Sequence, residues 1–133
     1  MTTFCYKVCR VENGKYFSEM GYHYPKWDTE YTIGKHVYAP VGKLFVYLDI
    51  AEAVKSVGDC SVLLKCSVGS IEYVESGEFE DFELQDSFPE FWKTRIAKTL
   101  FPTCRSNIAL VDYLVPKKVF SSEEVEALRR ILV

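Results

Sequence analysis

The chain has little net charge, few histidines and no long apolar run, and each shortage argues against a class of function. Its 133 residues carry a formal net charge of −3. A nucleic-acid-binding domain usually clusters Lys and Arg on one face, and the sequence indicates no such cluster. Apolar runs extend over only a few residues, whereas a membrane-spanning helix needs about 20. We therefore expect neither a nucleic-acid partner nor a membrane partner.

The chain also lacks the short motifs that commonly accompany catalysis. It contains no GxGxxG or GxxxxGK[ST] phosphate loop, no GxSxG or HExxH motif and no EF-hand loop. Its two histidines, His23 and His36, are too few for a His-rich metal site. We expect no metal and no cofactor. The sequence leaves enzymatic activity undecided and favours a non-enzymatic role.

The cysteines are odd in number and none are spaced CxxC. A secreted disulfide framework more often has an even number, and the first residues show no basic segment followed by an apolar one. Cysteines four or six residues apart on extended strands lie roughly 13–20 Å apart, too far for one tetrahedral zinc ion. We expect reduced, mostly buried thiols and a cytoplasmic location. The five are Cys5, Cys9, Cys60, Cys66 and Cys104.

The first part of the chain is typical of strands joined by turns. Alternating residues over 3–11 predict a strand, and Asn13-Gly14 is a strong hairpin signal. A second strand is expected over 15–20, antiparallel to the first. The next expected elements are a loop over 21–30, a short extended stretch over 31–38 broken at Gly34, and a turn over 39–42.

A buried strand and a short helix are expected next. The apolar run 44–48 predicts a central strand covered on both faces. Asp49 with Glu52 three residues later resembles a capping box, and Gly58 is typical of a helix end. Further strands are expected over 60–68, with Cys60 and Cys66 on one face, and over 71–74 after a turn near Gly69.

The last part begins with a strongly acidic segment. Residues 72–86 hold seven acids and no base, which is typical of a solvated loop. A helix is then expected from about 87 to 101, followed by a strand over 106–115 that ends at Pro116. A final helix is expected to begin at 121–124 and to direct four apolar residues inward: Val125, Leu128, Ile131 and Leu132.

These elements together predict one α+β domain over residues 1–133. They show no regular strand–helix–strand alternation, so a doubly wound parallel sheet is not expected. The expected sheet is mixed and mostly antiparallel, with an N-terminal β-hairpin and about three helices packed on it.

Aromatic residues make up 15% of the chain and are concentrated between residues 16 and 38. Tyr and Trp rings offer flat contact area with a polar group, which suits binding surfaces, and loops lie at the surface. The candidate binding residues are Tyr22, His23, Tyr24, Trp27, Tyr31, His36 and Tyr38, with positive charge nearby from Lys15, Lys26 and Lys35. The alternative is that most of these rings cover the outer core of the sheet.

Several short segments resemble small uncharacterised proteins of phages and large DNA viruses. They are 6–10 (YKVCR), 31–35 (YTIGK), 39–40 (AP) and 42–47 (GKLFVY), followed by Ala51 and Ala53. The resemblance covers roughly the first half of the chain. It implies a viral or mobile-element origin and brings no established activity.

A strand ending at Arg10, later followed by Gly42-x-Leu-Phe-Val and a helix with small residues, is similar to the first half of compact ADP-ribosyltransferase-type folds. That resemblance implies that Arg10 grips NAD and that a later glutamate, Glu72 or Glu75, acts in transfer. The protein would then be a nucleotide-binding enzyme, active or degenerate.

Three functional hypotheses follow from the sequence. The first is a small, virus-encoded binding domain that contacts a protein partner or a small ligand, in the host cytoplasm if the origin is viral, with Arg10 among its binding residues. The second is the ADP-ribosyltransferase-like protein. The third is a structural homo-oligomer, such as a homodimer, in which exposed aromatic side chains and an edge strand join the subunits.

Overall fold

The computed structural model describes residues 3–18, 28–40, 43–73 and 108–132. These residues form strands and helices, so the α+β class is confirmed. Every strand pairing among them is antiparallel, in line with the expected mostly antiparallel sheet. Within these residues no helix is long and apolar enough to cross a membrane.

The N-terminal hairpin is confirmed. Strand β1 (Phe4–Glu12) pairs with β2 (Lys15–Ser18). The two turn residues, Asn13 and Gly14, have φ angles of 53° and 75°. A two-residue turn with positive φ at both positions matches the right-handed twist of the flanking strands, and Asn-Gly adopts it at low cost.

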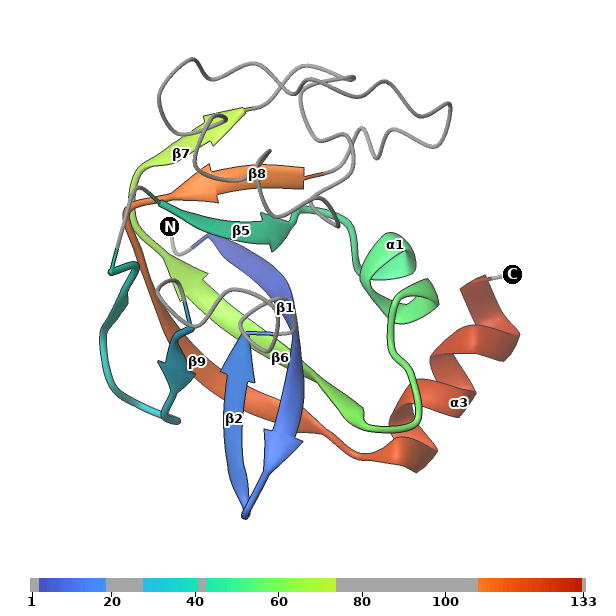
Figure 1. Cartoon of the computed structure of the whole chain (residues 1–133). Helices are drawn as coiled ribbons and strands as arrows, with labels where there is room; N and C mark the ends of the chain where they lie inside the picture. Colours follow the sequence, from blue (N-terminus) through green and yellow to red (C-terminus); the bar gives the residue numbers. More distant parts are fainter. Residues whose placement is uncertain (1–2, 19–27, 41–42, 74–107, 133) are drawn as a thin grey trace, which may run out of the picture.

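The strands around β1 form a ring (Figure 1). β5 (Leu44–Tyr47) and β6 (Ser61–Val68) both pair with β1. β8 (Ile108–Val111) pairs with β5, and β9 (Tyr113–Phe120) pairs with β6. Only Asp112 separates β8 from β9, so one bent stretch of chain closes the ring. The sequence predicted a single strand here, over 106–115.

Three short strands extend the sheet beyond the ring. β7 (Ile71–Tyr73) pairs with β8, β3 (Glu30–Tyr31) pairs with β2, and β4 (Val37–Tyr38) pairs with β9. The sheet therefore follows the order β4-β9-β6-β1-β5-β8-β7, with β2 and β3 branching from β1.

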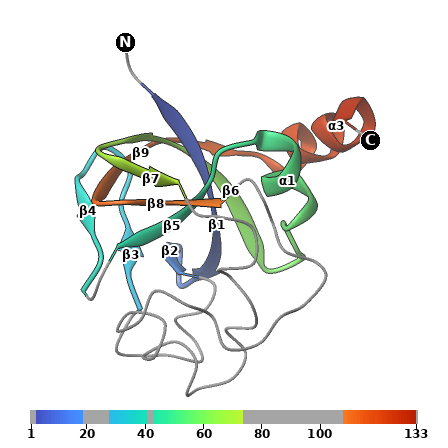
Figure 2. The same cartoon turned by 90° about the horizontal axis from the view of Figure 1, so that it is seen from above.

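Two helices occur in the described residues, where about three were expected. α1 (Ile50–Lys55) begins at Asp49, whose carboxylate accepts a hydrogen bond from the Ala51 amide at 2.9 Å. α3 (Ser122–Leu132) lies beside α1, as Figures 1 and 2 show. The acidic loop expected at 72–86 lies outside the described residues apart from its first two positions, and the helix expected over 87–101 lies entirely outside them.

The final helix has the capping box that its sequence predicts. The Glu124 amide donates to the Ser121 hydroxyl, and the Ser121 amide donates to the Glu124 carboxylate, both at 3.1 Å. The inward face is shorter than expected. Val125 is buried, but Ile131 is 76% exposed and Leu132 37% exposed, so the expectation that both face inward is wrong.

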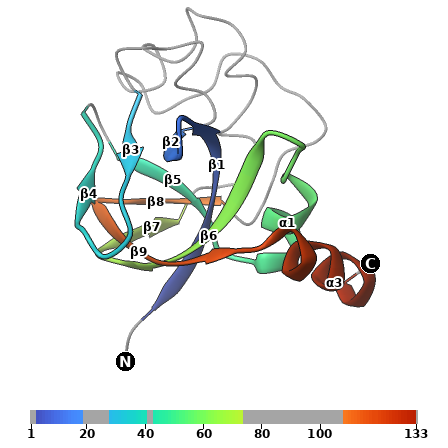
Figure 3. The same ribbon diagram turned by 90° about the horizontal axis from the view of Figure 1, so that it is seen from below.

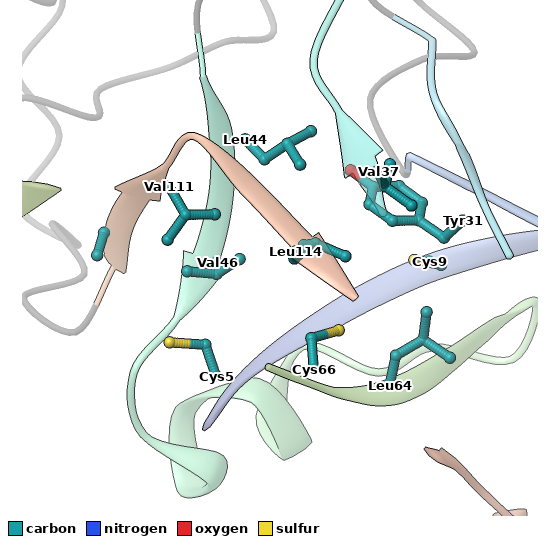
Figure 4. Close-up of a cluster of buried hydrophobic side chains, with 11 residues drawn as sticks. Cys5, Cys9, Tyr31, Val37, Leu44, Val46, Leu64, Cys66, Val111 and Leu114 are labelled. Atoms are coloured by element: carbon teal, nitrogen blue, oxygen red, sulfur yellow. The ribbon is translucent and has the colours of Figure 1, made fainter. Parts of the chain in front are cut away.

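The sheet separates two apolar cores. One fills the ring and contains Cys5, Cys9, Tyr31, Leu64 and Cys66 among its buried residues (Figure 4). The other lies between the outer face of the sheet and the two helices, and contains Val8, Ala53, Val54, Leu63 and Val125. β6 directs Leu64 and Cys66 into the first core and Leu63 into the second, because successive side chains of a strand point to opposite faces.

Pro116 does not end a strand, which corrects the expectation. It lies inside β9, where Cys66 is opposite Pro116 while Lys65 is opposite Lys118. Lys117 is therefore an extra residue in a β-bulge. A proline cannot donate to a ladder, and a bulge is one of the few places in a sheet where it is tolerated.

Two smaller expectations also need correction. Cys60 precedes β6 and is exposed, so it does not share the buried face with Cys66. β5 is buried at Leu44 and Val46 but only half-buried at Phe45 and Tyr47, so it is not covered fully on both faces.

Candidate functional site

A shallow groove lies between β3 and β4, which run side by side in Figure 3. Its volume is about 380 Å³, near the lower end of the range for ligand sites. The strands and the turn between them supply most of its lining: Asp28, Thr29, Glu30, Thr32, Lys35, His36, Val37, Tyr38 and Pro40.

The turn that forms one end of the groove is held by the backbone. Gly34 has a φ of 83°, a left-handed conformation that glycine adopts without a steric penalty. The Lys35 amide donates to the Thr32 carbonyl at 3.1 Å, which closes the turn. The Gly34 amide donates to the Pro116 carbonyl at 2.8 Å, which fixes the turn to the bulge of β9.

β3 and β4 are consecutive in the chain but are not hydrogen-bonded to one another. Within the described residues β3 pairs only with β2, and β4 pairs only with β9. Each strand therefore has an edge that pairs with no other strand in the part of the chain that the structure describes. Such edges are templates for pairing with another extended segment.

Three aromatic side chains meet beside the groove. Tyr38 is opposite Tyr113 on β9, with ring centroids 5.7 Å apart. His36 lies 6.4 Å from the Tyr38 ring and 5.1 Å from the Tyr113 ring. These separations are in the range where aromatic rings attract one another. Tyr38 is nonetheless 62% exposed, so the cluster presents a ring to solvent.

Asp28 at the other end of the groove is held by Arg10. The guanidinium donates from two nitrogens to the two Asp28 carboxylate oxygens, at 3.1 and 2.8 Å. It also donates to the Ser18 carbonyl at 2.6 Å and to Glu12 at 3.2 Å. The Asp28 hydrogen bond is the main cause of the raised pKa of Arg10.

All three nitrogens of Arg10 thus have partners inside the protein, and its carbon Cζ lies 5.1 Å from the Phe17 ring centroid. An arginine that grips NAD would have to give up these bonds. The observed geometry supports a different role, in which Arg10 joins β1 to Ser18 and Asp28 and so positions one wall of the groove.

Of the sequence candidates, the structure brings His36 and Tyr38 together at the groove, with Lys35 beside them. Tyr31 is 1% exposed and belongs to the core inside the ring of strands. Its burial raises its pKa well above the ordinary value. The candidates Tyr22, His23, Tyr24 and Trp27 lie outside the described residues.

The sequence did not point to Asp28, Glu30, Pro40 or Tyr113. Tyr113 is 75 positions from Tyr38 by number, and only the pairing of β4 with β9 brings them together. The polar residues carry a weak signal, because charged and turn-forming residues are common in surface loops. Their spacing predicts no particular chemistry.

The interior of the ring of strands holds a second group of side chains of reactive types. Burial raises the pKa of the Cys5 thiol to about 11 and that of Cys66 to about 12. The Lys7 amine donates to the Phe45 carbonyl at 2.7 Å and lies 5.6 Å from the Tyr31 ring centroid. Thiols with raised pKa values are poor nucleophiles, because the thiolate is the reactive form. We therefore interpret this group as core.

Across the described residues, no group of three or more His, Cys, Asp or Glu side chains is arranged to hold a metal ion. No protein-family model, curated protein or solved structure matches the chain. The resemblance to viral proteins and to ADP-ribosyltransferase-type folds stays a prediction.

Proposed function

We propose that this protein is a binding domain, and that the groove between β3 and β4 takes an extended segment of a protein partner. The observation that carries the proposal is the pair of strand edges beside one groove, next to the exposed ring of Tyr38. An extended peptide added to a sheet edge gains main-chain hydrogen bonds, and side-chain contacts beside the edge supply selectivity.

The lining of the groove indicates what kind of segment fits. Tyr38 and Pro40 offer apolar contact on the β4 side. The charges are balanced, because Asp28 is paired with Arg10 while Glu30 and Lys35 have opposite signs. The segment that fits best has an aromatic or proline side chain against Tyr38 and no strong net charge.

A library of displayed random peptides tests this proposal. We expect peptides with an aromatic or proline residue to be enriched. Tyr38→Ala should weaken their binding about tenfold or more, which corresponds to roughly 1.4 kcal/mol. Ile131→Ala is the matched control, because Ile131 is also highly exposed but lies on α3, away from the groove lining. Failure to enrich any peptide, or equal binding by Tyr38→Ala, would contradict the proposal.

A homodimer is the second candidate, because the same edge of β4 and the same exposed ring suit a second copy of the chain. Light scattering over a wide concentration range distinguishes the two. A dimer that Tyr38→Ala converts to a monomer would favour self-association at this edge, and a monomer at high concentration would remove this candidate.

A further inference from the structure

A row of three side chains crosses the outer face of the sheet and shares no residue with the groove lining. Tyr6 on β1 is opposite Lys65 on β6, and Lys65 is opposite Lys118 on β9. These three strands are neighbours, as Figure 1 shows. Side chains directly opposite on adjacent strands share a face, so two ammonium groups and a phenol ring lie in one line across the sheet.

Two further rings flank the row. The Lys65 amine lies 4.4 Å from the Phe4 ring centroid, and the Lys118 amine lies 4.7 Å from the Phe120 centroid. The Tyr6 and Phe120 rings are 6.5 Å apart. Phe4 is 41% exposed. The surface therefore places positive charges beside aromatic rings. Phe4 is open to solvent, whereas Tyr6 and Phe120 are partly buried against the second core.

The charge on this surface is only partly neutralised. Lys118 forms an ion pair with Glu124 at 2.6 Å. Among the residues that the structure describes, Lys65 has no acidic partner, and neither does Lys117, the exposed extra residue of the bulge. Like charges directly opposite on adjacent strands are destabilising. Lys65 and Lys118 are such a pair, and the Lys118–Glu124 ion pair offsets part of their repulsion.

No local pattern in the sequence indicates this arrangement. Lys65 is more than fifty positions from Lys117 and Lys118, and the net charge of −3 hides a local excess of positive charge. The antiparallel pairing of β6 with β9 places Lys65 opposite Lys118, and Lys117 precedes Lys118 in the chain. The sequence-based expectation of no nucleic-acid partner depended on the absence of such a cluster.

We propose that this face, defined by Phe4, Tyr6, Lys65, Lys117, Lys118 and Phe120, binds single-stranded nucleic acid. Bases stack on aromatic side chains without strong sequence preference, and lysines contact the phosphates. A single nucleotide would use one ring and one ammonium group, whereas an oligonucleotide can use the whole row. The inference does not depend on the groove.

The expected binding is weak and depends on salt. Three ammonium groups that each replace a counterion give a slope of roughly −2 in a plot of log K against log salt, since single strands lose about 0.7 per contact. Each base stacked on an aromatic ring also tightens binding. Binding should thus be measurable at low ionic strength and fall steeply as salt is added.

Fluorescence anisotropy of a labelled oligothymidine, titrated with the full chain at low salt, tests the proposal. Lys65→Gln should weaken binding about fivefold and make the salt slope less negative by about 0.7. Phe4→Ala should weaken binding by a similar factor without changing the slope. Lys55→Gln is the matched control, because Lys55 is an exposed lysine on α1 that pairs only with Glu52 in the described residues, and it should leave binding unchanged.

Thermal unfolding of the same variants separates binding from folding. If Lys65 serves the ligand, Lys65→Gln should keep or raise the melting temperature, because it removes a like-charge pair. Several results would overturn the proposal: no anisotropy change, equal binding by Lys65→Gln, full competition by an equal concentration of thymidine monophosphate, or tighter binding to phosphatidylserine vesicles than to the oligonucleotide.

Discussion

The ring of Tyr113 lies directly over Gly69. A Cβ atom placed on Gly69 would overlap that ring, with Cδ1 at 2.6 Å and Cζ at 2.9 Å. The Gly69 amide also donates to the Tyr113 carbonyl at 3.0 Å, so neither residue moves easily away from the other. Tyr113 in turn contacts His36 and Tyr38. The small size of residue 69 thus positions the aromatic cluster beside the groove.

Gly69→Ala should therefore destabilise the protein and weaken peptide binding together. Displacing an aromatic ring from a packed site typically costs about 1–3 kcal/mol. Chemical denaturation measures the loss of stability, and peptide affinity measures the effect on the groove. Gly58→Ala is the control, because a Cβ at Gly58 would make only an ordinary contact, at 3.8 Å from the Ser61 hydroxyl. Equal stability of the two variants would contradict the account of Gly69.

Arg10 is expected to matter for stability. Arg10→Met removes the two-pronged ion pair with Asp28 and the bond to the Ser18 carbonyl. Charge-assisted hydrogen bonds contribute about 1.5–3 kcal/mol each when buried, and the partial exposure of this pair reduces that figure. We expect a loss of about 1–3 kcal/mol in urea denaturation.

A double-mutant cycle with Asp28→Asn identifies the source of that loss. The two substitutions should be less than additive, because they remove the same interaction. Additive effects would show that Arg10 acts mainly through its other contacts, with Glu12, Ser18 and Phe17. Calorimetric titration with NAD addresses the sequence-based hypothesis directly, and binding that Arg10→Met abolishes without unfolding would restore it.

The buried thiols predict instability at alkaline pH. Cys5 and Cys66 have pKa values of about 11 and 12 when folded, against an ordinary value of 9.0. The unfolded chain therefore loses these protons at lower pH than the folded chain does. The stabilisation is fully present below pH 9 and is lost progressively as the pH rises from 9 to the folded pKa values of about 11 and 12. The free energy of unfolding should fall by roughly 1.4 kcal/mol per pH unit for each thiol.

Urea denaturation at pH 8, 9 and 10 measures this loss of stability, because these pH values span the ordinary thiol pKa of 9.0. Cys66→Ala should flatten the dependence even though it leaves a small cavity. Thiol labelling followed by peptide mapping gives a second readout. Cys60 is exposed and should react in the native protein, while Cys5 and Cys66 should react only on unfolding. Rapid native labelling of Cys66 would contradict the buried position.

The final helix depends on its capping box. Ser121→Ala removes the acceptor for the Glu124 amide and should cost about 1 kcal/mol. Ser122→Ala, one residue later, is the control, because Ser122 is not part of the reciprocal pair. Thermal unfolding compares the two variants. Equal melting temperatures would show that the cap does not stabilise the native state.

Local signals predicted the local structure well. Asn13-Gly14 indicated the hairpin, and both Asp49 and Ser121 marked helix starts that the structure confirms. Each signal acts through hydrogen bonds or φ angles within a few residues, so the sequence alone contains it. The α+β class follows from the same elements.

Pairing between distant strands determined the structural features that local sequence signals could not predict. Pro116 looked like a strand end, but a bulge opposite Lys65 and Cys66 accommodates it. Tyr38 and Tyr113 meet only because β4 pairs with β9. The carboxylate that binds Arg10 with both of its oxygens belongs to Asp28, eighteen residues away. In each case the contact that determines the structure comes from a distant part of the chain. The types of the residues in contact do not predict it.

Amide hydrogen exchange of the β3 and β4 edges, with and without a saturating enriched peptide, tests the central proposal most directly. A segment that pairs with these edges uses their backbone groups. We expect amides within Glu30–Tyr31 and Val37–Tyr38 to exchange more slowly when the peptide is bound, while those of α3 stay unchanged. Unaltered amide exchange at both edges in the presence of saturating bound peptide would contradict the proposal that the partner segment pairs with these strands in the groove.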